Sequence, residues 1–295
     1  MSGPAPEAGT KVLLGGYQAE TSILTRALRQ LAGSLSRVPG ASWDVEVERD
    51  VTAHGKRAVD LLTMVEEGSC NICYFASSYL VDRIPALARF DAPFAVTDRA
   101  RLFRDLDGSV GEQLAEEVSS RTGYRVLGYW DNGFRHISNR LRPIRHPDDC
   151  RGMRIRTLAN PTYQKVLAAI GFTPLVIDVK DLVRAVEAHE VDSQENPLTN
   201  TVHFGLHRTH KHLSLTSHFH GVALLLANRA WFEALAPALQ SAVLTAARDA
   251  TVAQRGFAIE EDKLCLERLR RDGVTIVGPE KIDSAAFRAA VAGAG

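Results

Sequence analysis

The chain has 295 residues, of which 45% are hydrophobic and 24% are charged, so it can bury a large core in two domains of ordinary size. Lys+Arg and Asp+Glu both number 35, and this balance excludes an overall field that would attract nucleic acid or an anionic membrane. No apolar run approaches the roughly 20 residues that span a bilayer. Recognition of a charged ligand must therefore come from a local group of residues.

The first third of the chain alternates strand and helix patterns. Apolar periodicity predicts a strand over 11–17, a helix over 21–35, a strand over 43–50, a helix over 56–68 and a strand over 70–76. Thr21 or Ser22 is the candidate N-cap of the first helix, and Gly68 ends the second. This βαβαβ order is typical of a mostly parallel α/β sheet.

The middle of the chain repeats this alternation. Strand patterns occupy 125–139, 153–157, 173–177 and 191–194. Between them, Asn160 and Asp178 are candidate caps of helices over 161–171 and 179–190, and Asn196 with Pro197 opens another helix. The result is a second α/β unit.

The last part of the chain differs from both units. A strand-rich stretch over 212–228 precedes a long helical region over 229–271, in which Pro237 and Gly256 mark points where the helix could break. Gly273 ends this region before a short strand. Because no flexible linker separates the two α/β units, we expect two lobes joined by several chain crossings, with a cleft between them.

Two of the four cysteines, Cys70 and Cys73, have the spacing of a redox or metal motif. They lie in "SCNICYFA", which reads as a buried strand, and residues three apart on a strand face opposite ways. We therefore interpret them as small core residues.

The stretch "RGMRIRT", residues 151–157, contains the strongest candidate for a ligand contact. In parallel α/β sheets, ligands bind beyond the carboxyl ends of the strands. Arg156 is near the end of its predicted strand, and Asn196 follows the end of another, so both should face one edge of the sheet. A guanidinium matches a carboxylate with a planar fork of donors, which predicts a carboxylate site. A structural N-cap would equally explain Asn196.

Several separated motifs resemble one family. The string "GFRHISNRLRPIRHPDDCRGMRIR" (133–156), "DSQENP", "LSLTSH", "VEEGSCNICYFASSYL" and "FDAPF" resemble the dicarboxylate-binding solute-binding proteins of tripartite ATP-independent periplasmic (TRAP) transporters. The resemblance covers about residues 10–285 in order. It implies an α/β, two-lobed fold like that of class II periplasmic binding proteins, with a cleft between the lobes and a long bracing helix. Lobe I would hold residues 1–132 and 222–259, and lobe II residues 133–221 and 260–295.

The resemblance also implies roles for individual residues. Arg156 would pair with the ligand carboxylate, Arg135 would give a second cationic contact, and Asn196 would hydrogen-bond the ligand. Arg154 corresponds to a basic residue that is not a ligand, and Arg140 and Arg142 would be exposed or structural.

Further contacts are expected around the cleft. Those from the first lobe follow its strands: Gln18, Glu20, Tyr74, Phe75 and Ser77. Trp130 and Phe134 flank the crossing between lobes, and His218 lies at the return to the first lobe. For the aromatic residues, core packing is the alternative.

Six of the ten histidines lie between His203 and His220. His203 and His207 have a spacing that can bind metal on a helix, but we interpret them as a solvated helix face and expect no metal and no cofactor.

We therefore predict a binding protein rather than an enzyme, since no nucleophile elbow, P-loop, dinucleotide fingerprint or HExxH motif occurs. Expected partners are a small organic acid and the membrane subunits of a TRAP permease, with no nucleic acid, and the chain is expected to be a monomer. "MSGPAPEAGTK" lacks an apolar core for a secretory signal. The resemblance implies a periplasmic protein whose leader was removed. A cytosolic sensor, or an enzyme acting on a carboxylic acid on the same scaffold, stays as the alternative.

Overall fold

The predicted strands and helices lie where the apolar periodicity places them, with ends that differ by a few residues, and the structure adds helices over 99–106, 109–121 and 284–290 that were not predicted. The computed structural model describes residues 9–294, so most of the N-terminal stretch "MSGPAPEAGTK" lies outside the described part. The strands are β1 Thr10–Gly15, β2 Trp43–Glu48, β3 Ile72–Ala76, β4 Tyr124–Asn139, β5 Arg154–Thr157, β6 Thr173–Val176, β7 Ser193–Pro197, β8 His212–Asn228 and β9 Thr275–Val277. The helices are α1 Ile23–Leu35, α2 Asp60–Glu66, α3 Arg99–Leu106, α4 Ser109–Arg121, α5 Pro161–Ile170, α6 Val179–Glu187, α7 Leu198–His203, α8 Arg229–Ala234, α9 Pro237–Arg271 and α10 Ser284–Ala290. Among these helices, none has the length and apolarity needed to cross a membrane.

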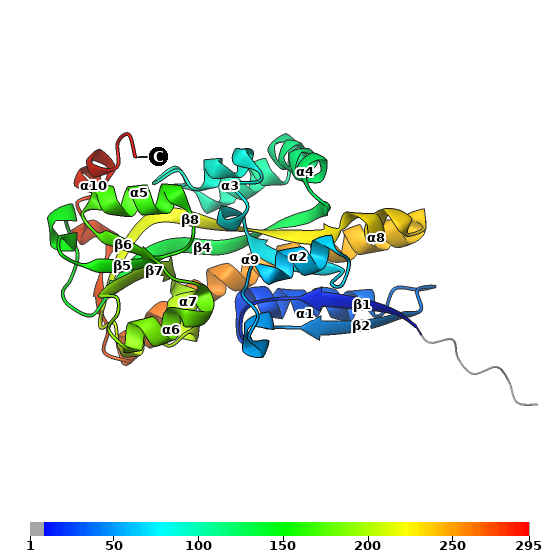
Figure 1. Cartoon of the computed structure of the whole chain (residues 1–295), viewed down its shortest axis with the longest axis horizontal. Coiled ribbons are helices and arrows are strands. Elements are labelled where there is room, and N and C mark those ends of the chain that lie inside the picture. The colour runs from blue at the N-terminus through cyan, green and yellow to red at the C-terminus, as the bar shows by residue number, and fades with distance from the viewer. Residues whose placement is uncertain (1–8, 295) are drawn as a thin grey trace, which may run out of the picture.

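The named strands of residues 9–294 form one sheet in the order β2-β1-β3-β8-β4-β7-β5-β6, with β9 paired to β8. The outer pairs β1/β2, β1/β3, β5/β6 and β5/β7 are parallel, as expected. The pairs β3/β8, β8/β4 and β4/β7 are antiparallel, so the prediction of a mostly parallel sheet is wrong at the centre. The centre of the sheet is built from β4 and β8, which Figure 1 shows running side by side across both halves of the molecule and which pair antiparallel.

Side-chain caps fix the starts of several helices. The Ser22 side chain accepts hydrogen bonds from two backbone N–H groups of the first turn of α1, and the Asp178 side chain accepts one from the backbone N–H of Lys180 in α6. Asn160 accepts from the backbone N–H of Tyr163 and places Pro161 at the first position of α5. These caps satisfy N–H groups that a helix start leaves free, and they confirm the predicted starts.

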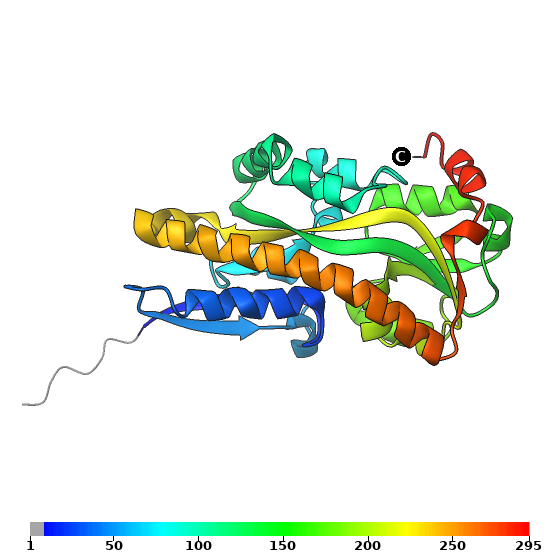
Figure 2. The ribbon, with the colours of Figure 1, turned by 180° about the vertical axis from the view of Figure 1, so that it is seen from behind.

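Helix α9 is the long brace. It contains 35 residues and is therefore about 50 Å long. Figure 2 shows it crossing the whole back of the molecule, and it packs on α1, β4 and α7. Of the two points where a break was considered, one is a break, at Pro237, because α8 ends at Ala234 and α9 begins at Pro237. The break considered at Gly256 does not occur, since a single glycine costs only about 1 kcal/mol, which the packing of the helix outweighs.

The apolar core has two main parts. The larger takes its residues from 12–130 and 222–258. A second takes residues from 137–172, 219 and 277–291, together with Phe94. Both main strands change register near the boundary between these parts, with shifts in β4 between Asp131 and Gly133 and between Arg135 and Ile137. Cys70 and Cys73 are free and fully buried in the larger part, as predicted.

Candidate functional site

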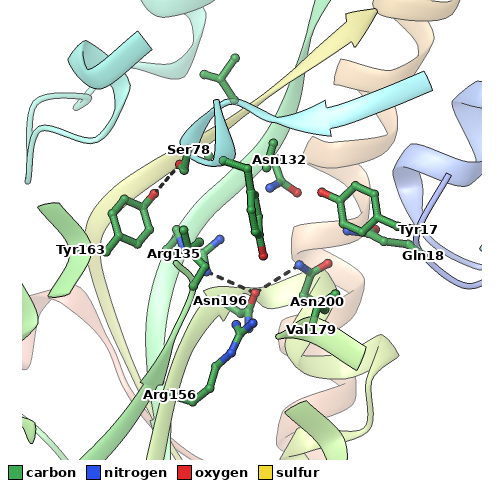
Figure 3. Close-up of a pocket in the computed structure, with 15 residues that line it drawn as sticks. Tyr17, Gln18, Ser78, Asn132, Arg135, Arg156, Tyr163, Val179, Asn196 and Asn200 are labelled. Atoms are coloured by element: carbon green, nitrogen blue, oxygen red, sulfur yellow. Dashed lines mark hydrogen bonds between the residues drawn. The ribbon is translucent and has the colours of Figure 1, made fainter. Parts of the chain in front are cut away.

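A small polar cavity lies where the two parts of the core meet (Figure 3). About 30 Å³ of it is open to the centre of a water molecule, so the cavity is nearly closed and has room for about two waters. From the chain before position 133 and after 221, it is lined by Tyr17, Gln18, Ala76, Ser78, Tyr79, Asn132 and Val222. From the rest of the chain, it is lined by Arg135, Arg156, Leu158, Tyr163, Val179, Asn196, Asn200 and Gly221.

Arg156 lines the cavity from the carboxyl end of β5. Its side chain is 2% exposed, and its Nε donates a hydrogen bond of 2.8 Å to the carbonyl oxygen of Ile177. Its Nη2 is buried and has no hydrogen-bond partner among the described residues. Burial lowers the pKa of this guanidinium, but arginine stays charged in proteins. A buried charge with an unused donor is costly, so the site is suited to an incoming anion.

Arg154, two residues earlier, has a different environment. It is exposed at the other end of β5, and its Nε lies 3.1 Å from Asp192 Oδ2. Arg140 also bonds to Asp192, with 2.6 Å between Nη2 and Oδ1. The two arginines of "RIR" therefore share a strand face but not a site, because they lie at opposite ends of a four-residue strand.

Arg135 reaches the cavity from β4, but its charge already has a partner. Its Nε and Nη2 both donate to the carboxylate of Glu195, and Nη2 lies 2.8 Å from the Glu195 carbonyl oxygen. Both side chains are buried. The pair raises the pKa of Arg135 above its ordinary value, despite the opposing effect of burial. Thr157 also donates to Glu195 Oε1, at 3.2 Å.

Asn196 belongs to β7 and is 4% exposed. It is not an N-cap, because α7 begins after Pro197 without a side-chain cap. Its Oδ1 accepts hydrogen bonds from Arg135 Nη2 (3.4 Å) and from Asn200 Nδ2 (3.2 Å), as Figure 3 shows. Its Nδ2 donates to Gln194. The cap interpretation of Asn196 is therefore wrong, and the side chain is held in the cavity wall.

A second group of hydrogen-bonded side chains, Ser78, Asp91, Asn160 and Tyr163, lies on another side of the cavity. The Ser78 hydroxyl lies 2.7 Å from Asp91 Oδ1 and 3.2 Å from the Tyr163 hydroxyl. Asn160 Nδ2 donates to Asp91 Oδ2 at 2.6 Å and to the Ser78 carbonyl oxygen at 3.0 Å. Burial raises the pKa of Asp91. These contacts join the turn after β3 to the start of α5 across the cavity.

The contacts expected after β1 fall in different places. Gln18 lines the cavity, and its Oε1 accepts a hydrogen bond of 2.6 Å from Ser22. Glu20 does not line it. Its side chain is exposed and forms ion pairs with Arg29 and Arg49 at the surface.

Of the residues expected to contact a ligand after β3, none lines the cavity. Tyr74 and Phe75 are fully buried within the core, where Tyr74 bonds to Thr25 and Phe75 packs on Tyr17. Ser77 is buried and does not line the cavity. The next two residues, Ser78 and Tyr79, occupy the wall instead, because the chain turns in a short 3₁₀ helix after β3.

Trp130 and Phe134, the aromatic residues expected to flank the crossing between lobes, do not point into the cavity. Trp130 is fully buried and donates to Thr251 on α9 at 3.0 Å. Phe134 packs against His220 and beneath Arg99. Neither residue lines the cavity, which receives Asn132 between them.

The histidines are structural in their contacts. His218 is buried behind the wall, with Nε2 3.8 Å from Glu195 Oε2, and burial lowers its pKa well below the ordinary value. His203 and His207 do not form a solvated helix face, because they contact Glu261 and Asp272 and His207 is 2% exposed. Within residues 9–294, no group of His, Cys, Asp and Glu could hold a metal ion.

Three polar wall residues lacked a strong sequence signal. Asn200 follows Asn196 by four residues, and this closeness in the sequence could have indicated it, although Asn196 lies in β7 and Asn200 in α7. Tyr163 lies in the first turn of the helix that Asn160 caps. Asn132 enters the cavity because of the register shift in β4, which the sequence does not reveal.

Two core regions joined by long shared strands, with a polar cavity between them, define a two-lobed α/β binding protein. The model of the family described as bacterial extracellular solute-binding protein, family 7 (DctP), matches residues 15–294. The chain belongs to this family of TRAP solute-binding proteins, and the prediction from the sequence motifs is confirmed.

Two relatives and one solved structure show what this chain is similar to. An uncharacterized protein of Haemophilus influenzae is 31% identical over 78% of this chain and 70% of its own length. The 2,3-diketo-L-gulonate-binding periplasmic protein YiaO of Escherichia coli is 28% identical over 74% of this chain and 66% of its own. The crystal structure of a TRAP periplasmic solute-binding protein of a Polaromonas species, bound to D-erythronate, has a TM-score of 0.89 at 25% identity, and the alignment covers 96% of this chain and 92% of that one.

Proposed function

We propose that this protein captures a small organic acid by its carboxylate at Arg156, encloses it between the two lobes and delivers it to the membrane subunits of a TRAP permease. The observation that carries the proposal is the buried Arg156 guanidinium, whose Nη2 has no partner among the described residues. A ligand carboxylate would supply the missing charge. Each charge-assisted hydrogen bond contributes roughly 1.5–3 kcal/mol, so two of them supply roughly 3–6 of the about 8 kcal/mol that micromolar binding requires, and the other wall contacts would supply the rest.

Around this anchor, the proposal assigns the other contacts by their position in the wall. Asn196 and Gln18 would hydrogen-bond the ligand, and Arg135 would contribute through a part of its guanidinium that Glu195 leaves unused. The proposed lobes are residues 1–132 with 222–259 and residues 133–221 with 260–295. In support, the two main parts of the core divide at nearly the same positions, apart from Phe94.

The proposal includes three further points. The protein acts in the periplasm, which fits its family. It acts as a monomer and binds no nucleic acid, which fits its balanced charge. It binds its ligand without turnover, because closure around a carboxylate places Arg156 and amide groups, rather than a nucleophile and a base, around the bound acid.

A thermal-shift screen of organic acids tests the proposal. A ligand at 100 times its Kd adds about 2.7 kcal/mol, which should raise the melting temperature by several degrees. Calorimetry then gives the affinity, and mass spectrometry of the recovered ligand should find it unchanged. The proposal fails if no carboxylic acid in a broad panel stabilises the protein, or if the recovered acid is converted.

A further inference from the structure

The charge balance of the cavity discriminates between classes of organic acid. Of the lining residues that the structure describes, the charged ones are Arg135 and Arg156. Glu195 neutralises Arg135 through contacts to both Nε and Nη2. The cavity therefore presents one uncompensated positive charge, that of Arg156.

The neighbouring ionisable groups supply no second cation. His218 faces Glu195, and burial, with the nearby Arg135, keeps it neutral by lowering its pKa. Asp91 lies behind Ser78 and can only add negative charge. Burial raises the pKa of Tyr79 and Tyr163, so both hydroxyls stay protonated and can act as donors.

The rest of the polar wall is neutral and rich in hydrogen-bonding groups. Figure 3 shows amides and hydroxyls around the cavity, contributed by Tyr17, Gln18, Ser78, Asn132, Tyr163, Asn196 and Asn200. Such groups pair with ligand hydroxyls, and a ligand that lacks hydroxyls would leave them unpaired in a nearly closed space.

We propose that the cavity selects hydroxylated monocarboxylates over dicarboxylates, and that Glu195 sets this selection by occupying Arg135. The inference rests on the proposed function, because it assumes that Arg156 binds a carboxylate. One ligand carboxylate balances Arg156. A second carboxylate would be buried without a cation, since the only other one lining the described cavity is already paired.

Four acids, each with four carbons, distinguish the effect of a second carboxylate on binding from the effect of hydroxyl groups. Erythronate has one carboxylate and three hydroxyls, tartrate has two carboxylates and two hydroxyls, butyrate has one carboxylate alone, and succinate has two. Calorimetry at neutral pH should find erythronate bound at least 100-fold more tightly than tartrate, and both butyrate and succinate bound more weakly still.

The Glu195→Gln variant tests the role assigned to Glu195. Glutamine keeps the size and an acceptor for Arg135 but removes the charge, so the preference for erythronate over tartrate should narrow by at least tenfold. Asp192→Asn is the matched control, because it removes a buried carboxylate of the same lobe that pairs with Arg140 and Arg154 away from the cavity. Its preference should equal that of the wild type.

The outcomes separate this inference from the proposed function. Equal wild-type affinity for erythronate and tartrate, or a preference that Glu195→Gln leaves unchanged in a folded variant, overturns the charge selection. Butyrate binding as tightly as erythronate overturns the role of the hydroxyls. If Glu195→Gln does not fold, as judged by its melting curve, the wild-type panel decides alone. If none of the four acids binds, the proposed selection is overturned. The thermal-shift screen of a broad panel of organic acids then decides whether the proposed function is overturned as well.

Discussion

Arg135 and Glu195 form a buried ion pair across the neighbouring strands β4 and β7. Arg135 Nη2 lies 2.9 Å from Glu195 Oε1 and 2.8 Å from the Glu195 carbonyl oxygen. The pair holds Arg135 in the cavity wall without any ligand. Arg156, which lies on β5 at the far side of β7, has no such partner among the described residues. The guanidinium of Arg135 is therefore held by Glu195, whereas that of Arg156 is available to bind an anion.

Breaking the pair should be strongly destabilising. Arg135→Met leaves Glu195 as a buried charge without its main partner, and we expect a loss of about 3–5 kcal/mol in the free energy of unfolding, measured with urea. Replacing both residues, by Arg135→Met with Glu195→Leu, should cost less than the sum of the two single changes. A single change that costs under about 1 kcal/mol would show that the pair is not important for stability.

Removing Arg156 should affect stability in the opposite direction. Arg156→Met takes away a buried charge that lacks a carboxylate, so the unliganded protein should become more stable, by about 1–4 kcal/mol. Binding of organic acids should fall at least 100-fold, which calorimetry would measure. Arg154→Ala is the matched control on the same strand, and its affinity should not change. A wild-type affinity in Arg156→Met would exclude Arg156 as the anchor.

The sequence predicted the strands and most of the helices, because apolar periodicity and caps such as Asn160 act locally, but it did not predict α3, α4 or α10. It did not predict the direction of the central strands. A buried strand has the same apolar pattern whether its neighbour is parallel or antiparallel, so β4 and β8 gave no sign that they pair antiparallel across the whole molecule.

The sequence also located the edge of the sheet where the cavity lies, through Arg156 and Asn196, but not which side chains turn into it. After β3 the wall begins at Ser78 rather than Ser77, and in β4 it receives Asn132 rather than Trp130. These choices depend on the 3₁₀ turn after β3 and on the register shift in β4. Both are set by tertiary packing and not by residue type.

Because of the buried His136, the protein should lose stability at pH values well above those at which carboxylates titrate. Burial, with a contribution from Arg99, lowers the pKa of His136 to about 3. In the unfolded chain its pKa is near 6.5, so below that pH the unfolded state binds a proton that the native state does not. Stability should then fall as pH decreases from 6.5, by about 1.4 kcal/mol per unit from this group.

Urea unfolding at pH 7.5, 6.5 and 5.5 would measure this slope. His136→Gln should reduce it, because the variant lacks the imidazole whose pKa burial lowers. Equal slopes for the wild type and His136→Gln would contradict the assignment.

Gly133 should be less replaceable than another glycine of similar backbone conformation. Gly133 has φ +86° and Gly152 has φ +79°, a region that costs other residues about 1–2 kcal/mol. A Cβ at Gly133 would lie 3.3 Å from the Cβ of Pro197, whereas one at Gly152 would meet nothing within 4 Å. Gly133→Ala should therefore destabilise more than Gly152→Ala.

The change at Gly133 should also weaken ligand binding. Pro197 directly follows Asn196, so a displaced Pro197 would move this amide in the cavity wall. Urea unfolding and calorimetry on the two variants would measure both effects, with Gly152→Ala expected to bind as the wild type does. Equal losses of stability in the two variants would mean that the contact with Pro197 relaxes freely. Unchanged affinity in Gly133→Ala would mean that Asn196 keeps its place, or that its position does not matter for binding.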